Sequence, residues 1–303
     1  MYYSLSLLAG AITALMLVLN GRMNQEISQG VSLVIIHVMG LLAVILYMVI
    51  KREKPVKTKL PLIWYVGGFI GIVTTIFNIS AFGHISVSAM MALALLGESL
   101  SGVLSDHVGF LGVPVRRFRA EKLLGVLFLL IGAAVMLEDF ALVPVIMSFL
   151  AGGTVLLSRL VNARLARKAG LSTTILINYM VGILGAVIVL FFMGLPEKIA
   201  FTLPFYNYLG GAIGALVVII STFVVGRIAT FYITLFMFIG QVFSGVFLDY
   251  LLDGAFSVRI ALGGVFVLIG LVINLLQDNA YNKKNNVANQ SDSLGETAKV
   301  KNA

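Results

Sequence analysis

The stretch Gly67-Gly68-Phe69-Ile70-Gly71 recurs later in the chain as Gly210-Gly211-Ala212-Ile213-Gly214. The same spacing relates a series of further matches: Gly83 and Gly226, Gly97-Glu98 and Gly240-Gln241, Ser101-Gly102-Val103 and Ser244-Gly245-Val246, and Asp106 and Asp249. Because both copies are almost wholly apolar, each predicts a block of membrane-spanning helices. A repeated block with an odd number of spans must lie inverted relative to its partner, an arrangement typical of secondary transporters.

The composition excludes a soluble globular protein. Of the 303 residues, 60% are hydrophobic and 11% are charged, and the mean hydropathy is +1.05. A soluble domain has about 25% charged residues. Apolar runs near twenty residues long allow helices to cross roughly 30 Å of hydrocarbon. The alternating polarity of membrane β-strands does not occur in them. The sequence therefore predicts an all-α integral membrane protein.

We predict ten transmembrane helices, because ten apolar runs are separated by short connections that carry Gly, Pro or charge. The runs are residues 3–19, 31–50, 62–82, 86–105, 122–137, 141–159, 171–193, 205–225, 229–248 and 259–277. They form two inverted five-helix repeats, residues 1–140 and 141–277. Residues 278–303 are polar and are predicted to be a disordered tail.

The basic residues predict the orientation of the chain. Most of the 21 Lys and Arg residues lie in the even-numbered connections or in the tail. Cytoplasmic loops carry the excess of Lys and Arg, so both termini, including the polar tail, are predicted to be cytoplasmic. The net charge of +8 is thereby explained as an orientation signal, and no nucleic-acid partner is predicted.

Several short motifs resemble a known family. They are Asn20-x-Arg22, Gly67-Gly68-x-x-Gly71, Gly97-Glu98, Gly240-Gln241, Asp106-His107 and Asp249. Their order resembles the YdcZ-like branch of the drug/metabolite transporter superfamily, with two five-span units fused. The resemblance implies a multi-pass carrier in the bacterial inner membrane. The chain departs from that pattern at Glu98, where the relatives tend to carry an amide.

Glu98 is the first candidate for coupling. It is the only acidic residue well inside a predicted span, roughly 18 Å along its helix at about 1.5 Å per residue, and charges within the membrane are usually functional. Burial favours the neutral form of a carboxyl group, so Glu98 could bind and release a proton. Gln241 holds the equivalent position in the second repeat, and its amide could bind substrate or Glu98. Both could instead only join helices.

The substrate-cavity candidates are polar residues within or at the ends of spans: Asn20, Arg22, Asn78, Asn162, Tyr179 and His37. Arg22 lies on the predicted outer side and could hold an anionic group, and His37 could titrate. Helix capping, headgroup contact and packing are the alternatives for this set. Gly67, Gly71, Gly210 and Gly214 form two small-x-x-x-small pairs, which we interpret as packing surfaces rather than ligand contacts.

The predicted function is secondary transport of a small organic metabolite or drug-like solute by alternating access, with proton-coupled export as the preferred direction. The predicted partners are that solute, protons and the lipid bilayer, for a monomer or homodimer, with no cofactor or metal. Motifs of soluble hydrolases, zinc enzymes and nucleotide-binding proteins are absent from the sequence, as is cysteine, so no enzyme is predicted. The alternatives are a non-transporting membrane sensor or scaffold, and an intramembrane enzyme that uses Glu98 with His37 or His107.

Overall fold

The structure is a computed structural model. It describes residues 1–57, 61–109, 121–137, 141–196, 201–224, 227, 230–254, 257–277 and 280, without the side chains at 106, 122, 221–223, 230–235 and 253. Gly226, the Asp106 side chain and nearly all of the predicted tail lie outside the described residues.

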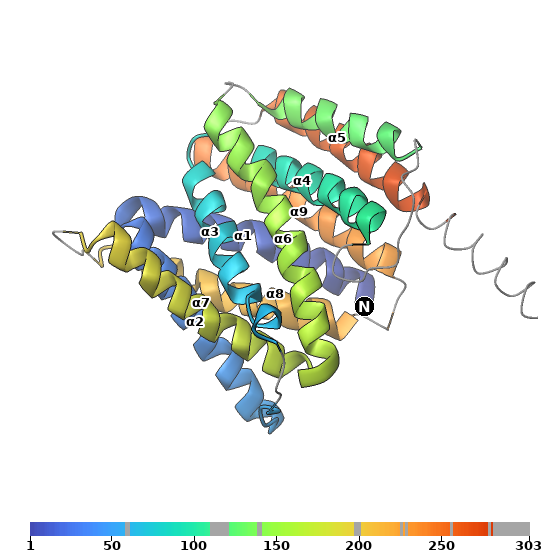
Figure 1. Ribbon diagram of the computed structural model, residues 1–303. Helices are drawn as coiled ribbons and strands as arrows, with labels where there is room; N and C mark the ends of the chain where they lie inside the picture. Colours follow the sequence, from blue (N-terminus) through green and yellow to red (C-terminus); the bar gives the residue numbers. More distant parts are fainter. Residues whose placement is uncertain are drawn as a thin grey trace, which may run out of the picture.

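The described chain is built from α-helices of fifteen or more residues, one in each predicted span (Figure 1). They are α1 (Tyr2–Glu26), α2 (Gln29–Lys51), α3 (Gly67–Ala81), α4 (Val87–Val108), α5 (Lys122–Met136), α6 (Leu142–Ala169), α7 (Leu171–Met193), α8 (Gly210–Val224), α9 (Thr230–Asp253) and a last helix, Val258–Gln277. Short 3₁₀ helices, η1 (Leu62–Trp64) and η3 (Phe205–Leu209), precede α3 and α8.

Six of these helices are long and apolar enough to cross a membrane by length and composition. The described residues also contain four shorter apolar helices, Gly67–Ala81, Leu123–Met136, Phe205–Ile220 and Phe236–Leu252. The prediction of an all-helical membrane protein is confirmed. The number of ten crossings and the cytoplasmic location of the termini stay predictions.

Helices α1 and α6 extend well beyond the predicted spans 3–19 and 141–159. They run for 25 and 28 residues, to Glu26 and Ala169. Hydropathy marks where an apolar run ends, but Arg, Lys and Gln are good helix formers and carry a helix onward into polar surroundings. The predicted connection after span six is therefore helical, and Arg159 and Arg164 lie on α6. The Arg164 guanidinium stacks 4.9 Å from the centre of the Trp64 ring.

The helices of the two predicted halves pack in reciprocal pairs. Helix α1 packs against α8 and α9, and α6 packs against α3 and α4 in the same way, while α2 packs against α7 (Figure 1). Each half therefore contributes its first helix to a groove formed by the other half. The division into two repeats stays a prediction, and these exchanged contacts support it.

Glycines allow the two halves to meet backbone to backbone. A Cβ added to Gly10 would lie 1.9 Å from the Met237 carbonyl oxygen, and one added to Gly152 would lie 1.8 Å from that of Ala94. On the facing helices, a Cβ added to Gly97 would lie 1.9 Å from the Phe149 carbonyl oxygen. A Cβ added to Gly240 would likewise meet a carbonyl oxygen of α1. Only small residues permit such crossings.

We expect Gly152→Ala to destabilise the protein and Gly71→Ala to be tolerated. A Cβ at residue 71 would meet nothing within 4 Å, whereas one at residue 152 would overlap the α4 backbone. Overpacking costs about 1–3 kcal/mol, while alanine otherwise gains roughly 0.5–1 kcal/mol over glycine inside a helix. Thermal unfolding in detergent, followed by size-exclusion chromatography, measures both variants. A melting temperature of Gly152→Ala equal to that of the parent protein would contradict the close approach of α4 and α6.

Candidate functional site

A cavity of about 160 Å³ lies among helices of both predicted halves. It is lined by residues of α1, α2, α3, α7 and α8: Met16, Leu17, Asn20, Ile36, His37, Gly71, Thr75, Asn78, Ile79, Asn178, Tyr179, Gly210, Gly211 and Gly214. Four of the residues predicted to line a substrate cavity, Asn20, His37, Asn78 and Tyr179, meet here. Their role in binding stays a prediction, but the structure places them around one space.

Glycine contributes more to this cavity than the repeat motif indicates. Gly71, Gly210 and Gly214 line it, and Gly71 has no neighbour that a Cβ would meet. Gly67 and Gly210 do pack closely against Asn162 and Asn20, while Gly71 faces the cavity. The interpretation of the four glycines as packing surfaces rather than ligand contacts stays a prediction. A glycine spacing cannot distinguish a helix contact from an open face, because both need the same absence of a side chain.

Asn20 is buried at the edge of this cavity with an unsatisfied amide. Its side chain is 7% exposed, and its Oδ1 has no hydrogen-bond partner among the described residues. The amide lies against Gly210, where a Cβ would be 1.9 Å from Oδ1. Buried polar atoms are normally paired. Of the buried side-chain atoms without a partner among the described residues, only the Asn20 Oδ1 belongs to a residue that lines this cavity.

Asn162 does not line the cavity itself but is hydrogen-bonded to a residue that does. Its Nδ2 donates to Oδ1 of Asn178 at 3.0 Å and to Oγ of Ser158 at 3.3 Å. The Ser158 hydroxyl in turn donates to the Gly67 carbonyl at 3.1 Å. Asn162 therefore orients Asn178, which lines the cavity and was not predicted as a site residue. No signal in the sequence distinguished Asn178 from other polar residues in spans.

His37 of α2 and Tyr179 of α7 face each other. Their ring centres are 6.0 Å apart. His37 Nδ1 donates to the Leu33 carbonyl at 2.8 Å, and the Tyr179 hydroxyl donates to the Gly211 carbonyl at 3.3 Å. Gly40 and Gly182 give these rings their space, because a Cβ at either glycine would overlap the facing ring.

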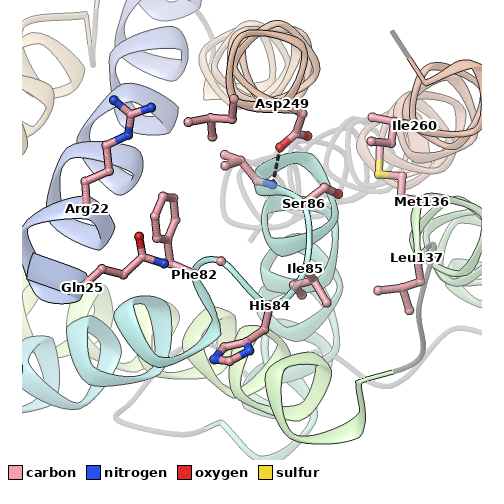
Figure 2. Close-up of a pocket in the computed structure, with 13 residues that line it drawn as sticks. Arg22, Gln25, Phe82, His84, Ile85, Ser86, Met136, Leu137, Asp249 and Ile260 are labelled. Carbon is pink, nitrogen blue, oxygen red and sulfur yellow. Dashed lines mark hydrogen bonds between the residues drawn. The ribbon is translucent and has the colours of Figure 1, made fainter. Parts of the chain in front are cut away.

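Arg22 belongs to a different cavity, of about 420 Å³, formed at the ends of the helices (Figure 2). Asp249 on its wall is 3% exposed and accepts hydrogen bonds from the backbone N–H groups of Val87 and Ser88. Asp249 of α9 thus caps the N-terminus of α4, where free N–H groups favour a carboxylate. The structure therefore separates Arg22 from Asn20, which the sequence grouped together.

Glu98 forms an ion pair with Arg159 of α6. The Glu98 side chain is 19% exposed and that of Arg159 is 54% exposed. Gln241 is buried on α9, and neither Glu98 nor Gln241 lines either cavity. The sequence did not predict this partner, because Arg159 was placed at the end of its span. The coupling role of Glu98 and Gln241 stays a prediction.

Comparisons with known proteins agree with the helical architecture. A solved structure titled "Crystal structure of protein" matches with a TM-score of 0.60 and 16% sequence identity, covering 90% of this chain and 98% of that one. At this identity the match shows the fold alone. No curated protein matches the chain.

The family comparison is more specific. The model of the family described as "Putative inner membrane exporter, YdcZ" matches residues 1–135 and 143–273. This description names a transport activity in the inner membrane, and the predicted multi-pass inner-membrane location is confirmed. With nearly its whole helical part matched, the chain belongs to the YdcZ family of the drug/metabolite transporter superfamily.

Proposed function

We propose that this protein is a secondary transporter that carries a small organic solute across the inner membrane by alternating access. The observation that carries the proposal is the cavity between α1, α2, α3, α7 and α8. Solute sites of transporters with inverted repeats lie where the repeats meet. This cavity has walls from both halves and a polar lining in a chain that is otherwise apolar.

The reciprocal packing of helices supports the alternating-access part of the proposal. Because α1 lies on α8 and α9 much as α6 lies on α3 and α4, the two halves can exchange conformations. In such an exchange one interface loosens while its counterpart tightens, and the central cavity opens to the other side. The backbone contacts at Gly10 and Gly152 lie in these two counterpart interfaces.

The ion pair of Glu98 with Arg159 supports proton coupling, because it joins α4 of one half to α6 of the other. Protonation of Glu98 would remove one charge of the pair and weaken this interface. Loss of the pair in each transport cycle would release α4 from α6 at this point.

Transport itself is tested in proteoliposomes loaded with the small-molecule fraction of a bacterial extract and with ethidium as a lipophilic cation. Solutes released under a pH gradient are identified by mass spectrometry. We expect at least one solute to leave faster than from protein-free liposomes. Solute binding to the purified protein without any release would favour the sensor or scaffold alternative.

We expect Gly71→Leu to abolish release while the protein stays folded. Residue 71 lines the cavity, and a Cβ there would meet nothing within 4 Å, so the leucine side chain would occupy the solute space. Gly71→Ala, which adds a single methyl group, is the matched control and should keep partial activity. Full activity of a folded Gly71→Leu protein would place the solute path elsewhere.

We expect Glu98→Gln to remove the stimulation of release by the pH gradient, because the amide cannot be protonated in the physiological range. Arg159→Lys is the control: it keeps a cation opposite Glu98 and leaves the carboxyl group able to titrate, so stimulation should remain. Release is compared with and without the gradient for both variants. Undiminished stimulation of Glu98→Gln would assign coupling to another group.

A further inference from the structure

We propose that the solute is a small uncharged molecule with hydroxyl or N–H groups, and that the amide of Asn20 binds it. This inference deepens the proposed function, since it identifies the class of solute for the cavity between α1, α2, α3, α7 and α8. It rests on an asymmetry between the two halves of the chain and on the charge of the cavity wall.

The asymmetry concerns two asparagines in counterpart positions. Asn162 lies against Gly67 at the start of α3, and Asn20 lies against Gly210 at the start of α8. The amide of Asn162 donates to Ser158 and Asn178. The Nδ2 of Asn162 therefore has its partners within the protein.

The two acceptors that the Asn162 Nδ2 uses have apolar counterparts beside Asn20. At the spacing that relates Asn20 to Asn162, the counterpart of Ser158 is Met16 and the counterpart of Asn178 is Ile36. Both counterparts line the cavity beside Asn20. Asn20 therefore lacks counterparts of these two acceptors. Separately, its Oδ1 has no hydrogen-bond partner among the described residues, although Asn20 is only 7% exposed.

A buried amide oxygen without a partner is unfavourable. A solute in the cavity would remove this penalty if it donated a hydrogen bond to Asn20. Such an oxygen also makes a binding site selective. An analogue of the solute that lacks the hydrogen-bond donor would leave the oxygen unpaired and would therefore bind much more weakly. The geometry therefore points to a hydroxyl or N–H group on the solute.

The cavity wall disfavours a charged solute. None of the described lining residues is Asp, Glu, Lys or Arg. The charged residues considered above lie elsewhere, with Glu98 paired to Arg159 and Arg22 in the other cavity. An ion entering a site within the membrane without a counter-charge pays a large desolvation cost. Uncharged hydrogen-bonding solutes avoid that cost.

The volume restricts the solute to a small molecule. The cavity has a volume of about 160 Å³. This is below the range of about 300–1,000 Å³ of pockets for drug-sized ligands. A short polyol or a small amide has the required size and donors.

The absence of cysteine from the chain allows the charge preference to be measured directly. Thr75→Cys places one thiol in the cavity, and Thr202→Cys places one on the exposed surface as the reference. The probes are three methanethiosulfonates with neutral hydroxyethyl, cationic trimethylammonioethyl and anionic sulfonatoethyl groups. Both variants are full-length and are labelled in nanodiscs. For each reagent, the labelling rate of the Thr75→Cys variant is divided by that of the Thr202→Cys reference variant.

We expect the neutral reagent to label the Thr75→Cys variant at least about tenfold faster, after this normalisation, than either charged reagent. An equal or faster rate for a charged reagent would overturn the proposal. The proposal would also be overturned if no reagent labelled residue 75 while residue 202 of the reference variant reacted normally. The cavity would then admit no solute.

The role of Asn20 is tested by comparing Asn20→Leu with Asn162→Leu. We expect Asn162→Leu to lower the melting temperature by several degrees, because it breaks two hydrogen bonds, and Asn20→Leu to leave it unchanged or raised. Asn20→Leu should nevertheless abolish release of uncharged solutes from the extract-loaded liposomes. Equal destabilisation by both variants, or normal release by Asn20→Leu, would refute the assignment of Asn20 as a binding residue.

The two proposals can fail separately. Release of only charged solutes from the extract would support transport and overturn the uncharged class. An absence of release, together with neutral-selective labelling at residue 75, would overturn transport and leave an uncharged-solute binding site.

Discussion

The close approach of backbones at glycine is the constraint on which the rest of this structure depends. At Gly10, Gly97, Gly152 and Gly240 a methyl group would collide with a carbonyl oxygen of the facing helix. In a bilayer the association of helices relies on such contacts, since lipid is as apolar as the side chains. These four glycines hold α1 on α9 and α6 on α4, and so join the first helix of each half to the opposite half.

This exchange of first helices determines where polar groups can meet. Helices α1, α2 and α3 of one half and α7 and α8 of the other enclose the cavity lined by Asn20, Asn78 and Asn178. Hydrophobic residues pack between the helices that form it, such as the cluster that includes Leu33, Ile72 and Ala186. The polar side chains are thereby confined to a small space between two well-packed regions, which is where a carrier needs its solute site.

Much of the fold and part of the site could be predicted from the sequence. Each apolar run contains a helix, because hydrophobic length is what a membrane span requires. Asn20, His37, Asn78 and Tyr179 were recognised because polar residues in spans are rare. Arg159 as the partner of Glu98 was missed, because α6 continues past the apolar run that ends there. Asn178 was missed because its importance depends on Asn162, which lies on another helix.

By itself the sequence determined that this is a helical membrane protein and predicted two similar halves, since hydrophobicity and repetition are properties of the linear chain. Only the tertiary structure decided which polar residues share a cavity and which are satisfied. Asn20 and Asn162 hold equivalent places in the predicted repeat, yet the Nδ2 of Asn162 has partners in the protein, while the Oδ1 of Asn20 has none among the described residues. Their neighbours differ too, because Asn178 of α7 accepts from Asn162, whereas Ile36 of α2 has no polar side-chain atom to offer Asn20. Such neighbours are set by the crossing of helices, and the order of residues along the chain does not reveal them.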